Sequence, residues 1–112
     1  MSVLDMSQEY SFRFDELRKN RVQTSFYKYG PAKKNFSTGN VQAIPTMQLC
    51  IDKYQKTGNT EYLLDAANYL MFEFMWPQHS KAHFRATSSS ESAGIVGISE
   101  MEMEAYRNGN YQ

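Results

Sequence analysis

The feature that most constrains the fold is a nearly continuous apolar run from Glu61 to Trp76, EYLLDAANYLMFEFMW. Consecutive apolar residues such as Tyr69–Phe72 break the alternation of a strand, and the run exceeds the usual strand length. The pattern therefore predicts a helix that Thr60 caps and that ends before Pro77, which cannot continue the hydrogen-bond ladder. Because the helix is apolar around most of its circumference, we expect neighbours to bury it on several sides.

A second helix is predicted directly before this one, over Ile44–Lys56. Pro45 suits its first turn, and Gly58 is placed to take the left-handed conformation that ends a helix. Asn59 and Thr60 then start the central helix at once, so the sequence predicts a tight antiparallel helical hairpin with Gly58 and Asn59 at its tip. The apolar face of the second helix is formed by Ile44, Met47, Ile51 and Tyr54.

Two flanking helices complete the predicted fold, over Phe12–Tyr29 and Ser99–Asn108. Residues 1–11 are expected to fray, and Pro31–Asn40 to form a basic loop. A chain of 112 residues suits one domain. The expected fold is therefore an all-α small helical bundle around the central hairpin, with a long ordered loop at residues 77–98 before the last helix.

The charges balance overall but not locally. The chain has 12 basic and 12 acidic residues, which argues against general electrostatic binding of nucleic acid. Residues 1–40 hold seven Lys/Arg against four Asp/Glu, about +3, and residues 41–112 hold five against eight, about −3. These halves could attract each other within one fold or between two subunits. A homo-oligomer is expected, because three short helices give the central helix little cover.

The cysteine content and the N-terminal residues suggest a cytoplasmic protein. Cys50 is the single cysteine, which excludes an intrachain disulfide framework. The first ten residues have neither the basic flank nor the apolar core of a signal peptide. The helix at Glu61–Trp76 is too short to span a membrane and carries carboxylates.

The segment from Gln78 to Gly94 is the predicted working surface, since connections of this length are usually functional or disordered. An arginine can hold a phosphate, a phenylalanine ring can stack on a base, and serine and threonine hydroxyls can add hydrogen bonds. No cofactor is expected. A metal site is not predicted either, since the histidines at i, i+4 lack an obvious third ligand. The candidate ligand-binding residues are His79, His83, Phe84, Arg85, Thr87, Ser88 and Glu91.

Glu61, Asp65 and Asn68 share one stripe of the central helix. The ordinary interpretation is a solvated stripe on an otherwise buried helix. The alternative is a Mg²⁺ site like that of the all-α MazG-type pyrophosphohydrolases, which take carboxylates from two helices. The preceding helix offers only Asp52, and a second acidic cluster is missing.

Basic residues interleave with aromatic ones between Arg18 and Phe36. This zone could bind nucleic acid, or it could face the acidic half of a partner subunit. We favour the second interpretation because the whole chain is neutral. The basic members are Arg18, Lys19, Arg21, Lys28, Lys33 and Lys34.

Several strings in the C-terminal half resemble a group of small bacteriophage and prophage proteins that have no established activity. The strings are TGNTEYLLDAANY over Thr57–Tyr69, FEFM over Phe72–Met75, HFRAT over His83–Thr87 and ESAG over Glu91–Gly94. The resemblance implies an accessory role in phage infection.

The function expected from the sequence is therefore a non-enzymatic phage protein that antagonises host antiviral defence by binding a ligand, such as a signalling nucleotide. One alternative is an inhibitor that binds a host defence protein directly, as anti-CRISPR proteins do. The other is the metal-dependent nucleotide pyrophosphohydrolase, with Glu61 and Asp65 at its centre.

Overall fold

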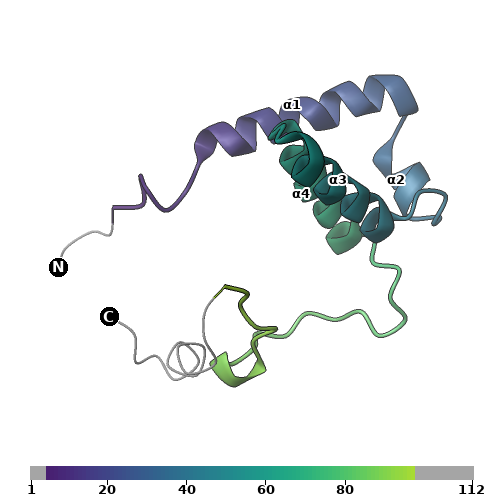
Figure 1. Ribbon diagram of the computed structural model, residues 1–112. Coiled ribbons are helices and arrows are strands. Elements are labelled where there is room, and N and C mark those ends of the chain that lie inside the picture. Colours follow the sequence, from purple (N-terminus) through teal and green to yellow (C-terminus); the bar gives the residue numbers. More distant parts are fainter. Residues whose placement is uncertain (1–4, 98–112) are drawn as a thin grey trace. The chain divides into compact units, whose positions relative to one another are not determined.

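The computed structural model describes residues 5–97 and is all-helical over that range (Figure 1). The predicted helix Ser99–Asn108 and the expected fraying of residues 1–4 lie outside the described residues. The chain divides into two compact units, one ending at Ala82 and one beginning at His83. The elements are α1 (Phe12–Tyr29), α2 (Ala32–Phe36), α3 (Ala43–Thr57), α4 (Glu61–Met75) and a 3₁₀ turn, η1 (Ser89–Glu91). Within residues 5–97, no helix is long and apolar enough to cross a membrane.

The α3–α4 hairpin is the main packing unit of the first region, as predicted. Gly58 takes the left-handed conformation, with φ 74° and ψ 5°, and its N–H donates to the carbonyl of Tyr54 at 2.7 Å. This bond closes the last turn of α3 and reverses the chain within a few residues. Two short helices can therefore pack along their length with little loop to order.

The start of α4 differs from the prediction in one detail. The side chain of Thr60 makes no capping hydrogen bond. Instead, Oδ1 of Asn59 accepts from the N–H of Glu61 at 3.0 Å. Thr60 has helical backbone angles, φ −67° and ψ −13°, and a residue that caps with its side chain normally has an extended backbone.

The predicted loop at Pro31–Asn40 instead contains the short helix α2. Gly30 precedes it with φ 80° and ψ −169°, a combination that is essentially restricted to glycine. Pro31 follows with φ −60° and leads into the helical turn. This turn buries Phe36, whose ring stacks on that of Phe72 with centroids 4.5 Å apart.

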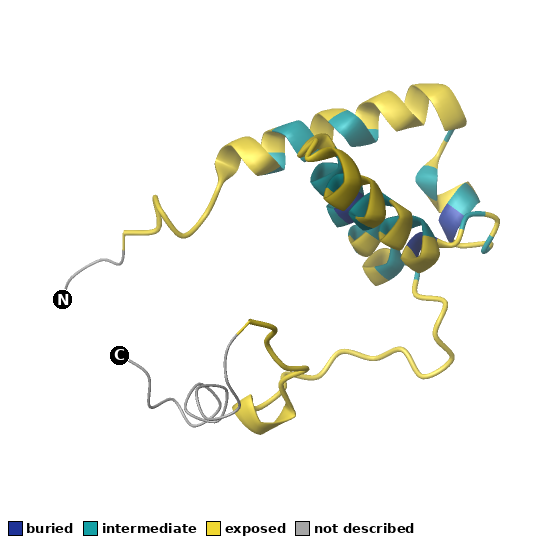
Figure 2. Ribbon diagram, in the orientation of Figure 1, coloured by how far each residue is buried: buried dark blue, intermediate teal, exposed yellow. Residues whose placement is uncertain are grey.

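The buried apolar core of the described residues is small (Figure 2). Around it pack partly buried side chains, including Val22, Tyr69 and Trp76. The helices α1, α2 and α3 all pack on α4, as expected of a helix buried on several sides, and they leave some of its apolar side chains exposed. The buried apolar residues are Phe36, Ala43, Ala66 and Phe72; the exposed ones on α4 are Leu70, Phe74 and Met75.

Candidate functional site

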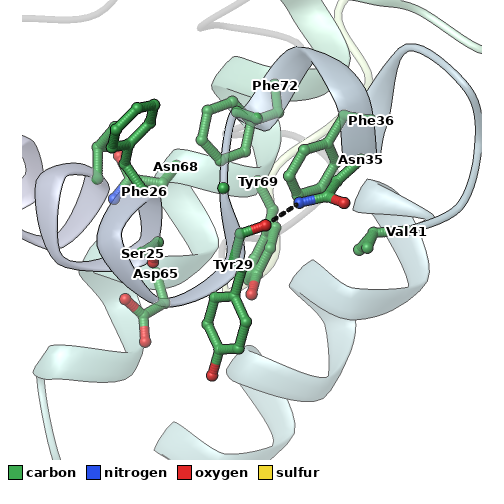
Figure 3. Close-up of a pocket in the computed structure, with 13 residues that line it drawn as sticks. Ser25, Phe26, Tyr29, Asn35, Phe36, Val41, Asp65, Asn68, Tyr69 and Phe72 are labelled. Atoms are coloured by element: carbon green, nitrogen blue, oxygen red, sulfur yellow. Dashed lines mark hydrogen bonds between the residues drawn. The ribbon is translucent and has the colours of Figure 1, made fainter.

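A pocket of about 300 Å³ lies between α1, α2 and α4 (Figure 3). Its aromatic floor, which we define as Phe36, Tyr69 and Phe72, comes from α2 and α4. The facing wall comes from α1, whose side chains of Phe26 and Tyr29 reach the pocket from the other side. A volume of this size is at the lower end of the range for small-molecule sites.

The aromatic floor is held rigidly by ring-to-ring packing. Besides stacking on Phe72, the ring of Phe36 lies 5.9 Å from that of Tyr69 at an interplanar angle of 51°. Trp76 extends the row, since its ring stacks 6.2 Å from Phe72 at 26°. These separations fall in the range where aromatic pairs add stability beyond burial alone. The floor is therefore preformed, and a flat ligand need not order it.

Several polar groups in the pocket wall have unused hydrogen-bonding capacity. Nδ2 of Asn35 donates to the carbonyl of Tyr29 at 3.2 Å, which fixes the amide and leaves its Oδ1 available. Within the described chain, the hydroxyls of Ser25, Tyr29 and Tyr69 form no hydrogen bond. These groups offer a ligand one amide acceptor and hydroxyls that can donate or accept.

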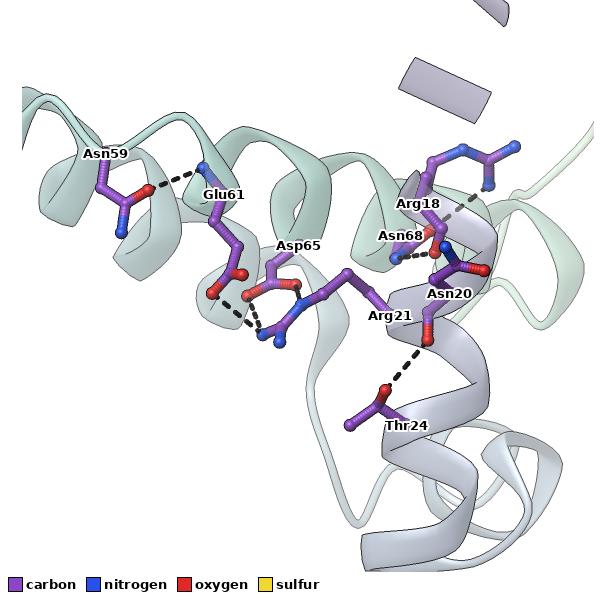
Figure 4. A network of polar contacts seen from close by, with 8 residues as sticks. All are labelled: Arg18, Asn20, Arg21, Thr24, Asn59, Glu61, Asp65 and Asn68. Atoms are coloured by element: carbon purple, nitrogen blue, oxygen red, sulfur yellow. Dashed lines mark hydrogen bonds and ion pairs between the residues drawn. The ribbon is translucent and has the colours of Figure 1, made fainter. Parts of the chain in front are cut away.

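The carboxylate in the pocket wall, Asp65, is neutralised by Arg21 of α1 (Figure 4). Nε and Nη2 of Arg21 donate to the two oxygens of Asp65, each at 3.0 Å. A second carboxylate, Glu61, lies 3.6 Å from the same guanidinium. The hydrogen bond with Asp65 raises the pKa of Arg21. One guanidinium therefore faces two carboxylates, and Asp65, the carboxylate that lines the pocket, is held in the ion pair.

Asn68 completes the contact between α1 and α4. It is 5 % exposed, yet its amide is satisfied at both ends. Its Nδ2 donates to the carbonyl of Arg18 at 3.0 Å, and its Oδ1 accepts from Nη1 of Arg18 at 3.3 Å. The stripe predicted to be solvated is thus the surface on which α1 docks. Part of the attraction expected between the basic and acidic halves acts here, within one chain.

Burial, and next the neighbouring Cys50 and Asp65, raise the pKa of Tyr69 above its usual range. The pKa of Cys50 is raised as well, mainly by burial and to a smaller extent by the charge of Asp65. Tyr69 is therefore a neutral donor at physiological pH, and Cys50 stays a protonated thiol of low reactivity.

The structure gives the hydrolase alternative little support. Glu61 and Asp65 are already engaged by Arg21, and Asp52 accepts from Gln48 at 3.0 Å. Among residues 5–97, no three His, Cys, Asp or Glu side chains gather where they could hold a metal ion.

In the second unit, Arg85, Ser88 and Glu91 come together around η1. The guanidinium of Arg85 forms an ion pair with Glu91. Oε1 of Glu91 accepts from the N–H and the hydroxyl of Ser88, both at 3.2 Å. The bond from Arg85, and then those from Ser88, lower the pKa of Glu91. A phosphate that bound Arg85 here would first have to displace Glu91.

Among residues 5–97, Phe84 and Thr87 form no hydrogen bond or ion pair with this turn. Phe84 is 87 % exposed, and Thr87 and His83 are also exposed. His79 belongs to the first unit, where its Nδ1 accepts from the N–H of Lys81 at 3.0 Å. Nearby, Gln78 is structural, since its Nε2 donates to the carbonyl of Phe36 at 3.0 Å.

The pocket as such was not predicted, although the sequence analysis singled out Asp65 and Asn68 as a polar stripe and Phe36 as the end of a basic, aromatic zone. Tyr69 and Phe72 appeared only as part of an apolar helix, and Phe36 fell in a predicted loop. One usable signal existed, because Tyr69, Phe72 and Trp76 follow the i, i+3, i+7 spacing of one helix face. The partner ring could not be inferred, since α2 is too short to show a period.

No protein-family model matches this chain, and searches of curated proteins and of solved structures find no match either.

Proposed function

We propose that this protein is a non-enzymatic binding protein that holds the base of a nucleotide in the pocket between α1, α2 and α4. The aromatic floor carries this proposal, because bases stack on protein rings with about 1–3 kcal/mol per base. In phage infection, as the sequence resemblance suggests, such binding would withdraw a signalling nucleotide from a host defence pathway.

The chemistry of the pocket wall favours a neutral, planar group. The charge of Asp65, the carboxylate in the pocket wall, is offset by its ion pair with Arg21. The available oxygen of Asn35 and the hydroxyls of Ser25 and Tyr29 suit the polar edge of a base. A purely aliphatic ligand would leave these groups unpaired.

The phosphate end would lie outside the pocket, where the exposed ammonium groups of α1 and α2 are available. Lys28 lies in the last turn of α1, and Lys33 and Lys34 lie on α2. In residues 5–97, these three lysines have no carboxylate within ion-pair distance. Such lysines act as point charges toward phosphate, so they would add affinity without selecting the base.

The test is calorimetric titration of the protein with a panel of nucleosides and with linear and cyclic nucleotides. Phe26→Ala removes a ring from the pocket wall and should weaken binding at least tenfold. Tyr27→Ala is the matched control, since Tyr27 neighbours Phe26 but is exposed and does not line the pocket. Failure of every compound to bind, or equal losses in both variants, would overturn the proposal.

Chromatography of the mixtures after heat denaturation separates binding from turnover. Release of the intact nucleotide is the expected result. Mg²⁺-dependent products would instead favour the hydrolase alternative.

A second candidate function is direct binding of a host defence protein through the second unit. The specific observation is the exposure of three large apolar side chains there, those of Phe84, Ile95 and Val96. Val96→Asp should then restore defence in infected cells that carry the targeted system, while nucleotide binding stays unchanged. Retained antagonism by this variant would remove the candidate.

A further inference from the structure

The side of α4 that its neighbours leave open carries a continuous apolar seam, which we define as Leu63, Ala67, Leu70 and Phe74. Their spacing of four, three and four residues places them on one stripe of the helix. Asp65 and Asn68, which hydrogen-bond to α1, lie on roughly the opposite side at about 100° per residue, and Met71, whose sulfur accepts from Arg18 at 3.1 Å, lies between the two. Leu70 is 49 % exposed and Phe74 is 76 % exposed.

One end of the seam meets a hollow and the other end carries a projecting ring. The hollow, about 200 Å³, lies between the start of α1 and the start of α4. Its apolar lining is Phe14, Leu17, Leu63 and Leu64. At the far end of the seam, Phe74 projects, and the adjacent Met75 is 51 % exposed. A single chain therefore carries both a large apolar side chain and a hollow that such a side chain could fill.

We propose that a second copy of this chain packs antiparallel on the seam, so that Phe74 of each copy enters the hollow of the other. In a two-fold pair, each contact occurs twice with the roles of the copies exchanged. The register follows from the spacing. Setting Phe74 opposite Leu63 also sets Leu70 opposite Ala67, because each pair has the same midpoint on the helix. A large side chain then faces a small one, as close helix packing requires.

The apolar area suits a dimer interface of the smaller kind. A phenylalanine side chain buries about 150–250 Å², and other large apolar side chains somewhat less. From the exposed fractions of Phe14 (38 %), Leu70, Phe74 and Met75, each copy offers roughly 400 Å² of such surface. With the flanking atoms, two copies would bury about 1,000 Å², near the lower limit for a specific interface.

The first test is the mass of the full-length protein by sedimentation equilibrium over a concentration series. The wild type should be dimeric, and Phe74→Glu should be monomeric because it places two charges inside the paired surface. Tyr27→Glu is the control, since Tyr27 is exposed on α1 away from the seam. A monomeric wild type, as expected if another segment of the same chain covers the seam, would overturn the proposal. So would a Phe74→Glu variant that remains dimeric with native helix content.

The second test is the register, by cross-linking in a Cys50→Ser background. Ala67→Cys mixed with Leu70→Cys should give a disulfide-linked dimer, because residues 67 and 70 of different copies lie opposite each other. Either variant alone should cross-link much less, since a disulfide requires Cα atoms within about 7 Å. Efficient linking of Ala67→Cys alone would indicate a parallel pair and overturn the antiparallel register.

The dimer and the proposed pocket can be tested separately. Phe74 does not line the pocket, so Phe74→Glu should keep the affinity for any nucleotide that the wild type binds.

Discussion

The pocket and the η1 turn both contain a carboxylate paired with an arginine and nearby hydroxyl groups, but they hold these groups by different means. In the pocket, three helices supply the parts, and Arg21 pairs with Asp65 across 44 residues of sequence. In the turn, Arg85 pairs with Glu91 only six residues away, and all participating side chains are exposed.

The difference shows why similar residue types need not make similar sites. Packing of helices leaves a space in the first case, and the hydroxyls and the amide at its edge stay available to a ligand. The turn closes on itself, so its polar groups satisfy one another. Residue type alone favoured the turn, while the arrangement of the helices favours the pocket.

The largest effect is expected for Phe72→Ala, which removes the centre of the aromatic floor. A Phe→Ala change at a buried site costs about 3–5 kcal/mol, through lost burial and the cavity that remains. Chemical denaturation should therefore show a strongly lowered midpoint, together with loss of nucleotide binding. Phe84→Ala in the exposed second unit is the control and should change the free energy of unfolding by less than about 0.5 kcal/mol. Similar decreases in the free energy of unfolding for Phe72→Ala and Phe84→Ala would contradict the contrast between a packed pocket and an exposed turn.

The next largest effect is expected for Gly30→Asn, which should lower the free energy of unfolding by about 1–3 kcal/mol. The backbone at Gly30 lies in a region of φ and ψ that other residues rarely enter. A matched change is Gly58→Asn, since asparagine tolerates the left-handed conformation found there. Thermal unfolding should show a clearly larger decrease in melting temperature for the Gly30 variant than for the Gly58 variant. If the two losses were equal, α2 would not depend on the bend that Gly30 makes.

Arg21→Met should lower the free energy of unfolding by about 1–2 kcal/mol, a value between those measured for exposed and for buried ion pairs. The side chains of Arg21 and Asp65 are partly exposed, so salt should screen the attraction. The difference from wild type should therefore shrink when urea titrations are repeated at high salt. Lys19→Met is the control, because Lys19 is exposed on α1, has no ion-pair partner among residues 5–97 and should change the free energy of unfolding little.

The smallest effect concerns pH and the η1 turn. Glu91 has a lowered pKa, so its ion pair stabilises the turn fully above the ordinary glutamate value of about 4.3. That contribution is lost as the pH falls through the lowered value in the folded state. Carboxyl chemical shifts should show Glu91 titrating below the ordinary value, and Arg85→Ala should return the midpoint toward it. The helices of the first unit should keep their melting temperature in this variant, and a large decrease would contradict a local role.

Much of the helical fold was predictable because its signals are local. The bounds of α1 agree with the prediction, and Gly58 fixed the turn of the hairpin through its backbone freedom alone. The helix α2 was missed because five residues show no periodicity and lie among basic and polar neighbours. Limited cover of α4 was expected from the small number of short helices, but which of its side chains stay exposed was not, since composition does not reveal where the neighbours pack.

The site was less predictable than the fold. Arg85, Ser88 and Glu91 do come together, since they are close in sequence, yet they bind one another. The stripe of Glu61, Asp65 and Asn68 was recognised as a polar unit, but its partners on α1 were not. Each of these contacts joins residues at least 40 positions apart, and no local pattern encodes the choice of partner.

By itself, the sequence determined an all-α chain with a hairpin at Gly58 and a polar stripe on an apolar helix. Backbone conformation and hydrogen bonding along the chain decide these features, and both act over a few residues. Only the tertiary structure decided that the stripe docks α1, that Phe36 stacks on Phe72, and that a pocket remains between them. Those outcomes depend on how three helices share the surface of α4, because each side chain there can face only one neighbour.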